Sequence, residues 1–155
     1  MDIGYASEKI TMYDEKNAAH SVAGQNGKTQ LIIAVPFINK TVKDELHKID
    51  TLLGGEDQND VECHLVVAND QHANPHLDHM DFLIDKEGEF GDWYGIRLHG
   101  DVLEGEFTKS LMLISKDGAI FYDEYPKDIS SSFNHDTLLR KIAAAQTCYT
   151  GKGCH

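Results

Sequence analysis

Two largely apolar runs with one amphipathic segment between them constrain the fold of this chain more than any other feature. Residues 31–35 (LIIAV) and 61–68 (VECHLVVA) each have the length of a β-strand. Between them, residues 41–53 place apolar side chains at helical spacing, and Gly54 with Gly55 ends that segment. Continuous apolar runs of strand length are typical of central strands buried on both faces. The sequence therefore predicts central strands covered by helices.

The rest of the chain predicts shorter elements around that centre. Residues 110–115 and 119–122 are apolar and flank Lys116-Asp117-Gly118, and an Asp-Gly turn between two such runs is typical of a hairpin. We further expect short strands at 10–13 and 82–84, short helices at 75–80 and 90–94, and a final helix at 136–147. Strands that alternate with helices, followed by a hairpin and a last helix, predict an α/β layer architecture.

The segment QLIIAVPFINKTVK, residues 30–43, leads from the first central strand through Pro36 into the helix. This order resembles the peroxiredoxin superfamily, most closely its thiol peroxidase branch of atypical two-cysteine enzymes. The apolar HLVVANDQ after the helix and the tetrapeptide WYGI at 93–96 strengthen the resemblance, which extends over roughly residues 8–145. It implies a thioredoxin-like fold of the peroxiredoxin type, with a central mixed sheet flanked by helices. We expect this domain at 1–147 and a cysteine-containing tail at 148–155.

The residues that carry the family's chemistry are replaced in this chain. The family has a proline, three residues, a threonine, two residues and the peroxide-attacking cysteine; the same spacing here gives Pro36, Lys40 and Lys43. The arginine that helps to hold the peroxide aligns with Lys109, and the stretch HANPHLDHM lacks the resolving cysteine. Peroxide reduction needs a thiolate, which lysine cannot replace. We therefore expect no ordinary peroxidase activity at this position.

Two of the three cysteines lie in the C-terminal segment CYTGKGCH. Five residues, two of them glycine, separate Cys148 from Cys154, and such a loop can bring their Cα atoms to the ~4.4–6.8 Å of a disulfide. Lys152 and His155 favour thiolate formation nearby. We predict that Cys148 and Cys154 form a redox pair, reduced by a thioredoxin-like partner; a tail with two incidental thiols is the alternative. The third cysteine, Cys63, lies on a predicted central strand, where we expect a buried, inert thiol.

Covalent haem attachment at the tail is a further interpretation of the same segment. The c-type haem signature has two residues between its cysteines and then a histidine. Here five residues separate the cysteines before Cys154-His155, so we expect no haem. We also expect no other cofactor.

The lysines of the altered motif allow a second hypothesis, a non-catalytic thioredoxin-fold binding module. Lys40 and Lys43 lie at the expected start of a helix, where backbone N–H groups and the helix dipole favour an anion. Lys109 would join them if the pocket geometry of the family is kept. The degenerate pocket would then hold an anion or a protein partner, whereas solvated surface lysines are the simpler interpretation.

The histidines suggest a third hypothesis, a metal-binding protein. His64, His72, His76 and His79 fall within 16 residues. On a helix, His72 and His76, or His76 and His79, would share a face, and imidazoles in that arrangement suit zinc, copper or nickel. Because Pro75 interrupts the run, a solvated loop without metal is the simpler interpretation.

Charge and hydropathy limit the partners that we expect. With 26 acidic and 14 basic residues the net charge is −12, which repels phosphates, so we expect no binding to nucleic acid or to an anionic membrane. Residues 1–17 have no apolar core of the signal-peptide type, and no window approaches 18 apolar residues. We expect a cytoplasmic protein and, by resemblance to the family, a possible homodimer.

Overall fold

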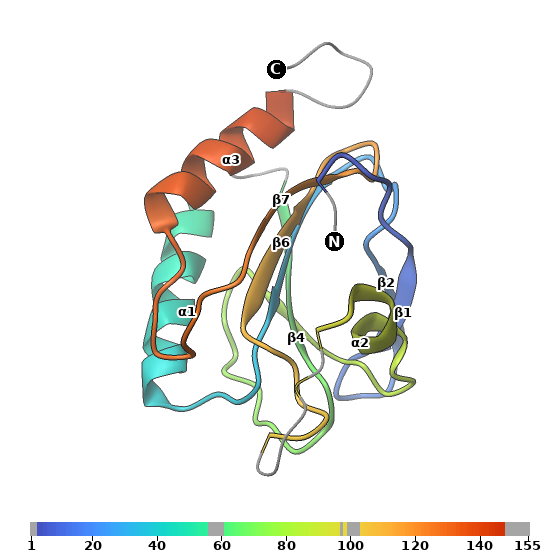
Figure 1. Ribbon diagram of the computed structural model, residues 1–155, viewed down its shortest axis with the longest axis vertical. Coiled ribbons are helices and arrows are strands. Elements are labelled where there is room, and N and C mark those ends of the chain that lie inside the picture. Colours follow the sequence, from blue (N-terminus) through green and yellow to red (C-terminus); the bar gives the residue numbers. More distant parts are fainter. Residues whose placement is uncertain (1–2, 56–60, 97, 99–102, 148–155) are drawn as a thin grey trace.

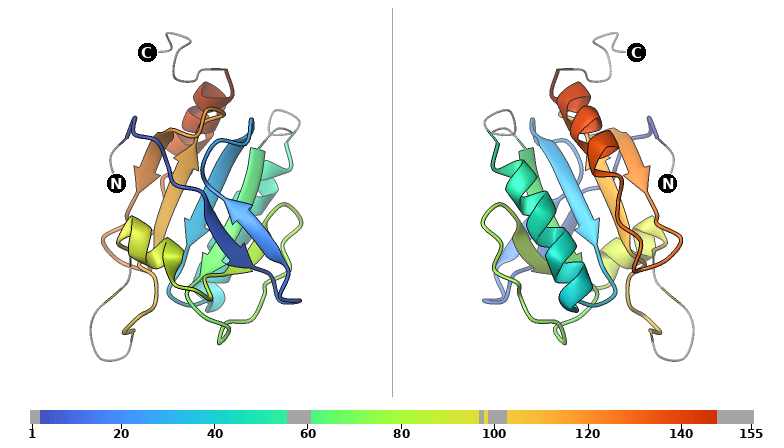
Figure 2. Two further views of the ribbon diagram at one scale, coloured as in Figure 1. Left: turned by 90° about the vertical axis from the view of Figure 1, so that its right-hand side faces the viewer. Right: turned by 90° about the vertical axis from the view of Figure 1, so that its left-hand side faces the viewer.

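The computed structural model describes residues 3–55, 61–96, 98 and 103–147. Within them, one seven-stranded mixed sheet has the strand order β2-β1-β5-β4-β3-β6-β7. The elements are β1 (Ile10–Tyr13), β2 (Ala19–Val22), β3 (Thr29–Ala34), α1 (Lys40–Leu53), β4 (Val61–Val67), β5 (Asp81–Ile84), α2 (Glu89–Tyr94), β6 (Ser110–Ile114), β7 (Ile120–Glu124) and α3 (His135–Thr147). Helices α1 and α3 cover one face of the sheet, and α2 with the β1–β2 hairpin lies over the other (Figures 1 and 2).

The two apolar runs form the centre of the sheet, as the sequence predicts. β3 runs parallel to β4, with Leu31 opposite Cys63, and antiparallel to β6. β4 in turn runs parallel to β5. Every residue of β3 is buried, because helices cover one face and the hairpin covers the other.

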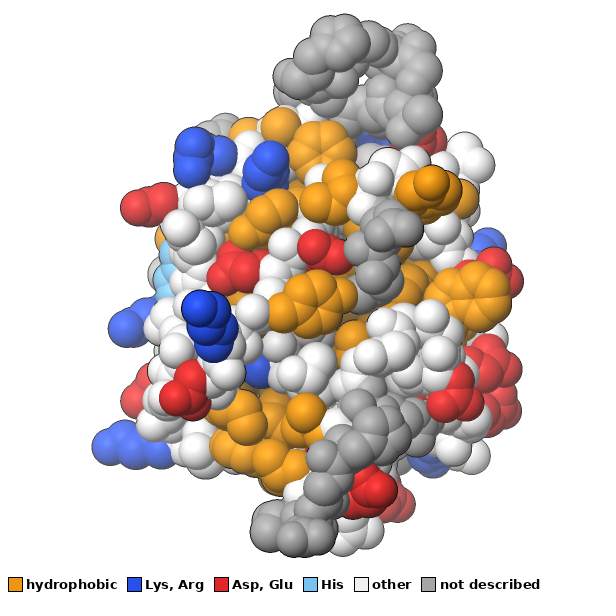
Figure 3. All heavy atoms as spheres, viewed as in Figure 1, with side chains coloured by type: hydrophobic (Ala, Val, Ile, Leu, Met, Phe, Trp, Pro, Cys, Tyr) orange, Lys and Arg blue, Asp and Glu red, His pale blue; other side chains and the backbone are white. Residues whose placement is uncertain are grey.

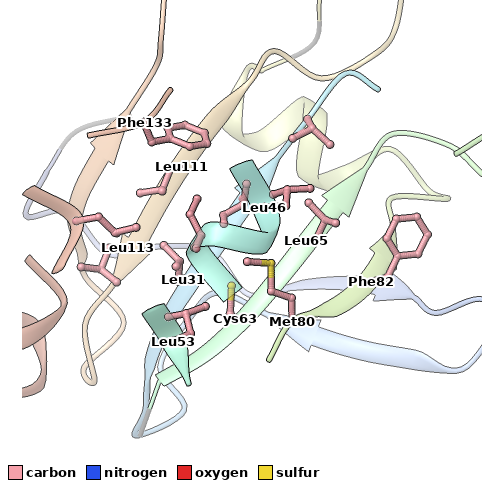
Figure 4. Packing of buried hydrophobic residues seen from close by; sticks show 14 of the residues in the cluster. Leu31, Leu46, Leu53, Cys63, Leu65, Met80, Phe82, Leu111, Leu113 and Phe133 are labelled. Atoms are coloured by element: carbon pink, nitrogen blue, oxygen red, sulfur yellow. The ribbon is translucent and has the colours of Figure 1, made fainter. Parts of the chain in front are cut away.

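Two apolar clusters fill the space on either side of the sheet. Leu31 and Ile33 of β3 pack toward α1 and α3, together with Leu46 of α1 (Figure 4). Ile32 and Ala34 point the other way, into the cluster beneath the hairpin and α2. Each fully buried leucine or isoleucine contributes about 1.5–3 kcal/mol relative to an exposed one. The alternation of β3 between two cores explains why residues 31–34 are apolar without interruption.

The helical turn predicted at 75–80 is wrong. The segment is irregular, His76 has a φ of 54°, and its N–H donates to Asn74 Oδ1 at 2.8 Å. A turn closed by an asparagine side chain competes with helix formation, and a left-handed residue stops it. The histidines therefore lie on a loop between β4 and β5.

The other predicted elements are confirmed, with ends that differ by one or two residues. Strand β2, which the sequence indicates only as extended chain, pairs with β1, and the hairpin joins β5 through the single pair Tyr13 and Ile84. Among the described residues, no helix has the length and apolar character needed to cross a lipid bilayer.

Candidate functional site

The altered motif lies where β3 leads into α1. Pro36 is buried just beyond the strand, and Asn39 caps the helix, since its Oδ1 accepts the Val42 N–H at 2.9 Å. α1 begins at Lys40, as the spacing predicts. Lys40 and Lys43 are both exposed. Lys43, which the sequence resemblance places at the position of the family cysteine, is therefore exposed to solvent.

Lys109, the third lysine, is buried and has a different environment. It is 3% exposed, and its ammonium donates to Glu45 Oε1 on α1 at 2.5 Å. It also donates to the carbonyl oxygens of Ser131 at 2.6 Å and Ile129 at 3.1 Å. Its Nζ lies 5.0 Å from the centre of the Phe133 ring. The three donor positions of this ammonium are thus occupied within the protein.

Glu45 completes this buried cluster from the other side. It is 7% exposed, and its Oε2 accepts the Phe133 N–H at 2.7 Å and lies 3.2 Å from His135 Nε2. The carboxylate thereby ties α1 to the segment that leads into α3. Sequence analysis missed Glu45, although a signal exists: Val42, Glu45, Leu46 and Ile49 share the apolar face of α1. A carboxylate on that face indicates a buried cationic partner.

The three lysines do not line a common pocket in the described part of the chain. Lys40 and Lys43 are exposed, whereas Lys109 is neutralised by Glu45. Figure 3 shows lysine and arginine side chains scattered among acidic and apolar ones on the visible face, rather than gathered in one basic patch. This arrangement does not favour the three-lysine anion site.

A small hollow lies beside the start of α1 instead. Its volume is about 240 Å³. It is lined by Phe37, Asn39, Thr41, Val42, Asp128, Ile129 and Ser130. Apolar and hydrogen-bonding groups face it together with one carboxylate, which suits a peptide side chain better than an anion.

Cys63 is the only cysteine within the described residues, and its thiol is free and buried. It lies on β4 and packs toward α1, near Leu53 and Met80 (Figure 4). Burial raises its pKa well above the ordinary value, and the nearby charges of Asp50 and Asp81 add to the shift. A thiol held in its neutral form is a poor nucleophile. Cys148 and Cys154, the predicted redox pair, lie outside the described residues.

The structure separates the three histidines of the predicted metal site. His72 Nε2 lies 2.8 Å from Glu106 Oε2, His76 is exposed, and His79 lies against Gly54 at the end of α1. Among the described residues, no group of three or more histidine, cysteine or acidic side chains is placed to hold a metal ion. The His72–His76–His79 site therefore gains no support.

His64 lies in a site that sequence analysis did not find. Its residue is 5% exposed, on the face of β4 that the hairpin covers. Its Nδ1 lies 3.5 Å from Asp81 Oδ2, and its Nε2 lies 3.8 Å from Glu62 Oε2. Neither nitrogen has a hydrogen-bond partner among the described residues. Burial lowers its pKa, although the two carboxylates oppose the shift. The single sequence signal is a histidine at an inward position of a buried strand.

Comparison with known proteins relates this arrangement to a fold family. No protein-family model and no curated protein sequence matches the chain significantly. Among solved structures, a peroxiredoxin-like protein from Aquifex aeolicus is similar with a TM-score of 0.80 and 18% identity, covering 92% of this chain and 86% of that one. A thiol peroxidase from Chromobacterium violaceum is similar with a TM-score of 0.75 and 13% identity, covering 90% and 85%. The chain has the peroxiredoxin fold.

A third structure, AhpC from Enterococcus faecalis, has a TM-score of 0.70 and 17% identity, covering 94% of this chain and 92% of that one. The predicted thioredoxin-like α/β fold of the peroxiredoxin type is thus confirmed. Identities this low show the peroxiredoxin fold alone. The assignment of Lys40, Lys43 and Lys109 to the family's active-site positions stays a prediction.

The WYGI tetrapeptide has a structural role at the end of α2. Tyr94 is buried and its hydroxyl both donates to Glu8 O and accepts the Glu8 N–H, at 3.0 and 3.1 Å. Gly95 ends α2 with a φ of 63°, which favours glycine. The motif thus fastens α2 to the chain that enters β1, and this role is structural.

Proposed function

We propose that this chain is a thiol–disulfide redox protein built on the peroxiredoxin fold, with Cys148 and Cys154 as its reactive pair. The observation that carries the proposal is that Lys43 and Cys63, outside the tail, offer no reactive thiolate. Lys43 occupies the aligned place of the attacking cysteine, and Cys63 is buried with a raised pKa. Redox chemistry in this chain therefore falls to the two thiols of the tail.

The reaction that we propose is disulfide exchange with a partner. One tail thiolate attacks a sulfur of the partner disulfide, forms a mixed disulfide and releases the partner's other sulfur as a thiolate. The second tail thiolate then attacks the tail sulfur of the mixed disulfide and releases the second partner thiol. The tail is oxidised by two electrons and the partner disulfide is reduced to a dithiol. A thioredoxin-like dithiol resets the tail by the same exchange in reverse.

The sequence of the tail supports this assignment. Lys152 and His155 are the basic side chains of this segment, and positive charge close to a thiol lowers its pKa. In contrast, burial of Cys63 opposes its ionisation, and the charges of Asp50 and Asp81 add to this effect. By resemblance to the family, a homodimer is a possible form of the protein.

Exchange with oxidised glutathione tests the proposal on the full chain. The reduced protein should form a disulfide between Cys148 and Cys154 and release two molecules of reduced glutathione. Cys148→Ser and Cys154→Ser should each stop at the mixed disulfide with one glutathione, whereas Cys63→Ser, the matched control, should react like the wild type. A wild-type protein that keeps glutathione attached, or that does not react, would overturn the proposal.

We propose partner binding at the hollow beside α1 as a second candidate function. It corresponds to the binding-module hypothesis, with a peptide side chain in place of an anion. The observation that favours it is the lining, in which the side chains of Phe37 and Ile129 meet polar groups of Asn39 and Ser130. Thr41→Arg would fill this hollow and should abolish capture of a protein partner, but leave glutathione exchange unchanged. A Thr41→Arg variant that still captures the protein partner would refute partner binding at this hollow.

A further inference from the structure

A second, larger hollow lies at the opposite end of α1, where the sheet is incomplete. Its volume is about 530 Å³. β4 begins at Val61, but β5 begins at Asp81, which pairs with His64. The first three residues of β4 therefore have no β5 residue opposite them. Gly54, at the end of α1, borders the space that this stagger leaves.

The charged side chains that line this hollow are carboxylates, and histidines accompany them. Three imidazoles and three carboxylates face the hollow, namely His20, His64, His79, Glu62, Asp78 and Asp81. Of the described residues that line it, none is a lysine or an arginine. Glu62 has two partners of its own: the Lys28 ammonium lies 3.6 Å from its Oε1, and the side-chain amide of Asn26 donates to its Oε2 at 3.2 Å. An anionic ligand would meet three carboxylates, of which the Lys28 ammonium offsets one.

The acidic lining alone would not define a ligand, but His64 provides an independent observation. A neutral imidazole has one N–H and one lone pair, and each ring nitrogen of His64 faces a carboxylate oxygen. In either tautomer, one nitrogen is therefore an acceptor that faces another acceptor. The side chain is 6% exposed and has no hydrogen-bond partner among the described residues. Only the imidazole of such a pair is buried, since the side chains of Glu62 and Asp81 are 37% and 66% exposed, so the ring nitrogen is the atom that needs a donor.

The spacing of these acceptors defines the donor. Nε2 and Glu62 Oε2 are 3.8 Å apart, and Nδ1 and Asp81 Oδ2 are 3.5 Å apart. A nitrogen with two N–H groups can lie ~2.8–3.0 Å from both members of either pair. A single metal ion would have to draw both atoms to ~2.0–2.2 Å, and the two carboxylates lie at different ring nitrogens.

We propose that this hollow binds a small organic cation through an ammonium or guanidinium group, with His64, Glu62 and Asp81 as its acceptors. The positive charge offsets the carboxylates, and the N–H groups satisfy the ring nitrogen that has no donor. Burial keeps the imidazole neutral, which leaves the lone pair available. This site is separate from the tail cysteines, so the proposal is independent of the redox function.

Agmatine, which carries one amine and one guanidine, is a suitable probe. Titration of the ¹⁵N-labelled full chain with agmatine should shift the ring nitrogens of His64 in a saturable way, and calorimetry should give the same dissociation constant. Asp81→Asn should weaken binding about tenfold, because one charge-assisted hydrogen bond is lost. Its side chain is 66% exposed, so this variant should fold. Asp136→Asn, an exposed site on α3, removes the same charge elsewhere and should bind like the wild type.

Tetramethylammonium, which has the charge but no N–H group, should not shift the His64 nitrogens. Four results would overturn the proposal. Equal effects of tetramethylammonium and agmatine would mean that only the acidic surface attracts cations. Equal weakening by Asp81→Asn and Asp136→Asn would mean the same. If the His64 ring responds to zinc chloride but not to agmatine, the hollow is a metal site. If it responds to neither, water supplies the missing donor.

Discussion

Buried ionisable side chains have different consequences at two places in this chain, the Lys109–Glu45 pair and His64. At the first, Lys109 and Glu45 neutralise one another between α1 and the strands. Such a pair is weak evidence for stability, since its desolvation cost offsets its attraction. Removal of one member, however, leaves an uncompensated charge in the interior. The pair therefore restricts substitution at a place where the resemblance implies an active site.

Substitution of Lys109 tests this role. Lys109→Met should lower the free energy of unfolding by about 3–5 kcal/mol, because Glu45 and two carbonyl oxygens lose their donor. Urea unfolding measures this as a lower midpoint. Lys43→Met, the matched control on the exposed face of α1, should change stability by less than about 0.5 kcal/mol. Equal effects of the two substitutions would contradict the buried ion pair.

His64 makes stability depend on pH. Burial lowers its folded-state pKa below the ordinary 6.5, so the unfolded chain binds the proton first on acidification. Stability should therefore fall as the pH decreases through 6.5 toward the folded-state pKa. His64→Gln should lose less stability than the wild type between about pH 7 and about pH 5. The exposed His47→Gln should keep the wild-type pH profile; an unchanged profile in His64→Gln would refute the assignment.

At the scale of elements, periodicity predicts the buried parts well and the loops poorly. β3 and β4 could be located from sequence because strands buried on both faces are largely apolar, as in residues 31–34 and 65–67. α1 could be located because its apolar face and the glycines after it are local features. The segment at 75–80 could not, because Asn74 closes a turn and His76 adopts a left-handed conformation. Propensity carries no information about that side-chain contact.

The start of α1 depends on a single cap. Asn39→Ala should lower the free energy of unfolding by about 1 kcal/mol, because the Val42 N–H loses its acceptor. Thermal unfolding monitored by circular dichroism measures the change. Asn39→Ser restores a capping oxygen and should recover most of the stability. A serine variant as unstable as the alanine variant would show that the cap is not the cause.

At the scale of the whole molecule, the fold was predictable and the candidate site only in part. The order of elements and the motif spacing sufficed for the thioredoxin-like layers, because they reflect local patterns distributed over the chain. Glu45 and His64 could not be assigned partners, since those partners come from distant segments such as Lys109 and Asp81. Their pairing depends on how the strands and helices are placed in space.

The proposed redox function depends on the two tail cysteines, Cys148 and Cys154. Differential alkylation with mass spectrometry, before and after a small excess of oxidised glutathione, tests this function because it measures each cysteine separately. We expect a reversible disulfide between Cys148 and Cys154. Cys63 should stay unmodified and become alkylated only after the protein is unfolded. Oxidation of Cys63 in the folded protein, or tail cysteines that react no faster than a free thiol, would contradict this function.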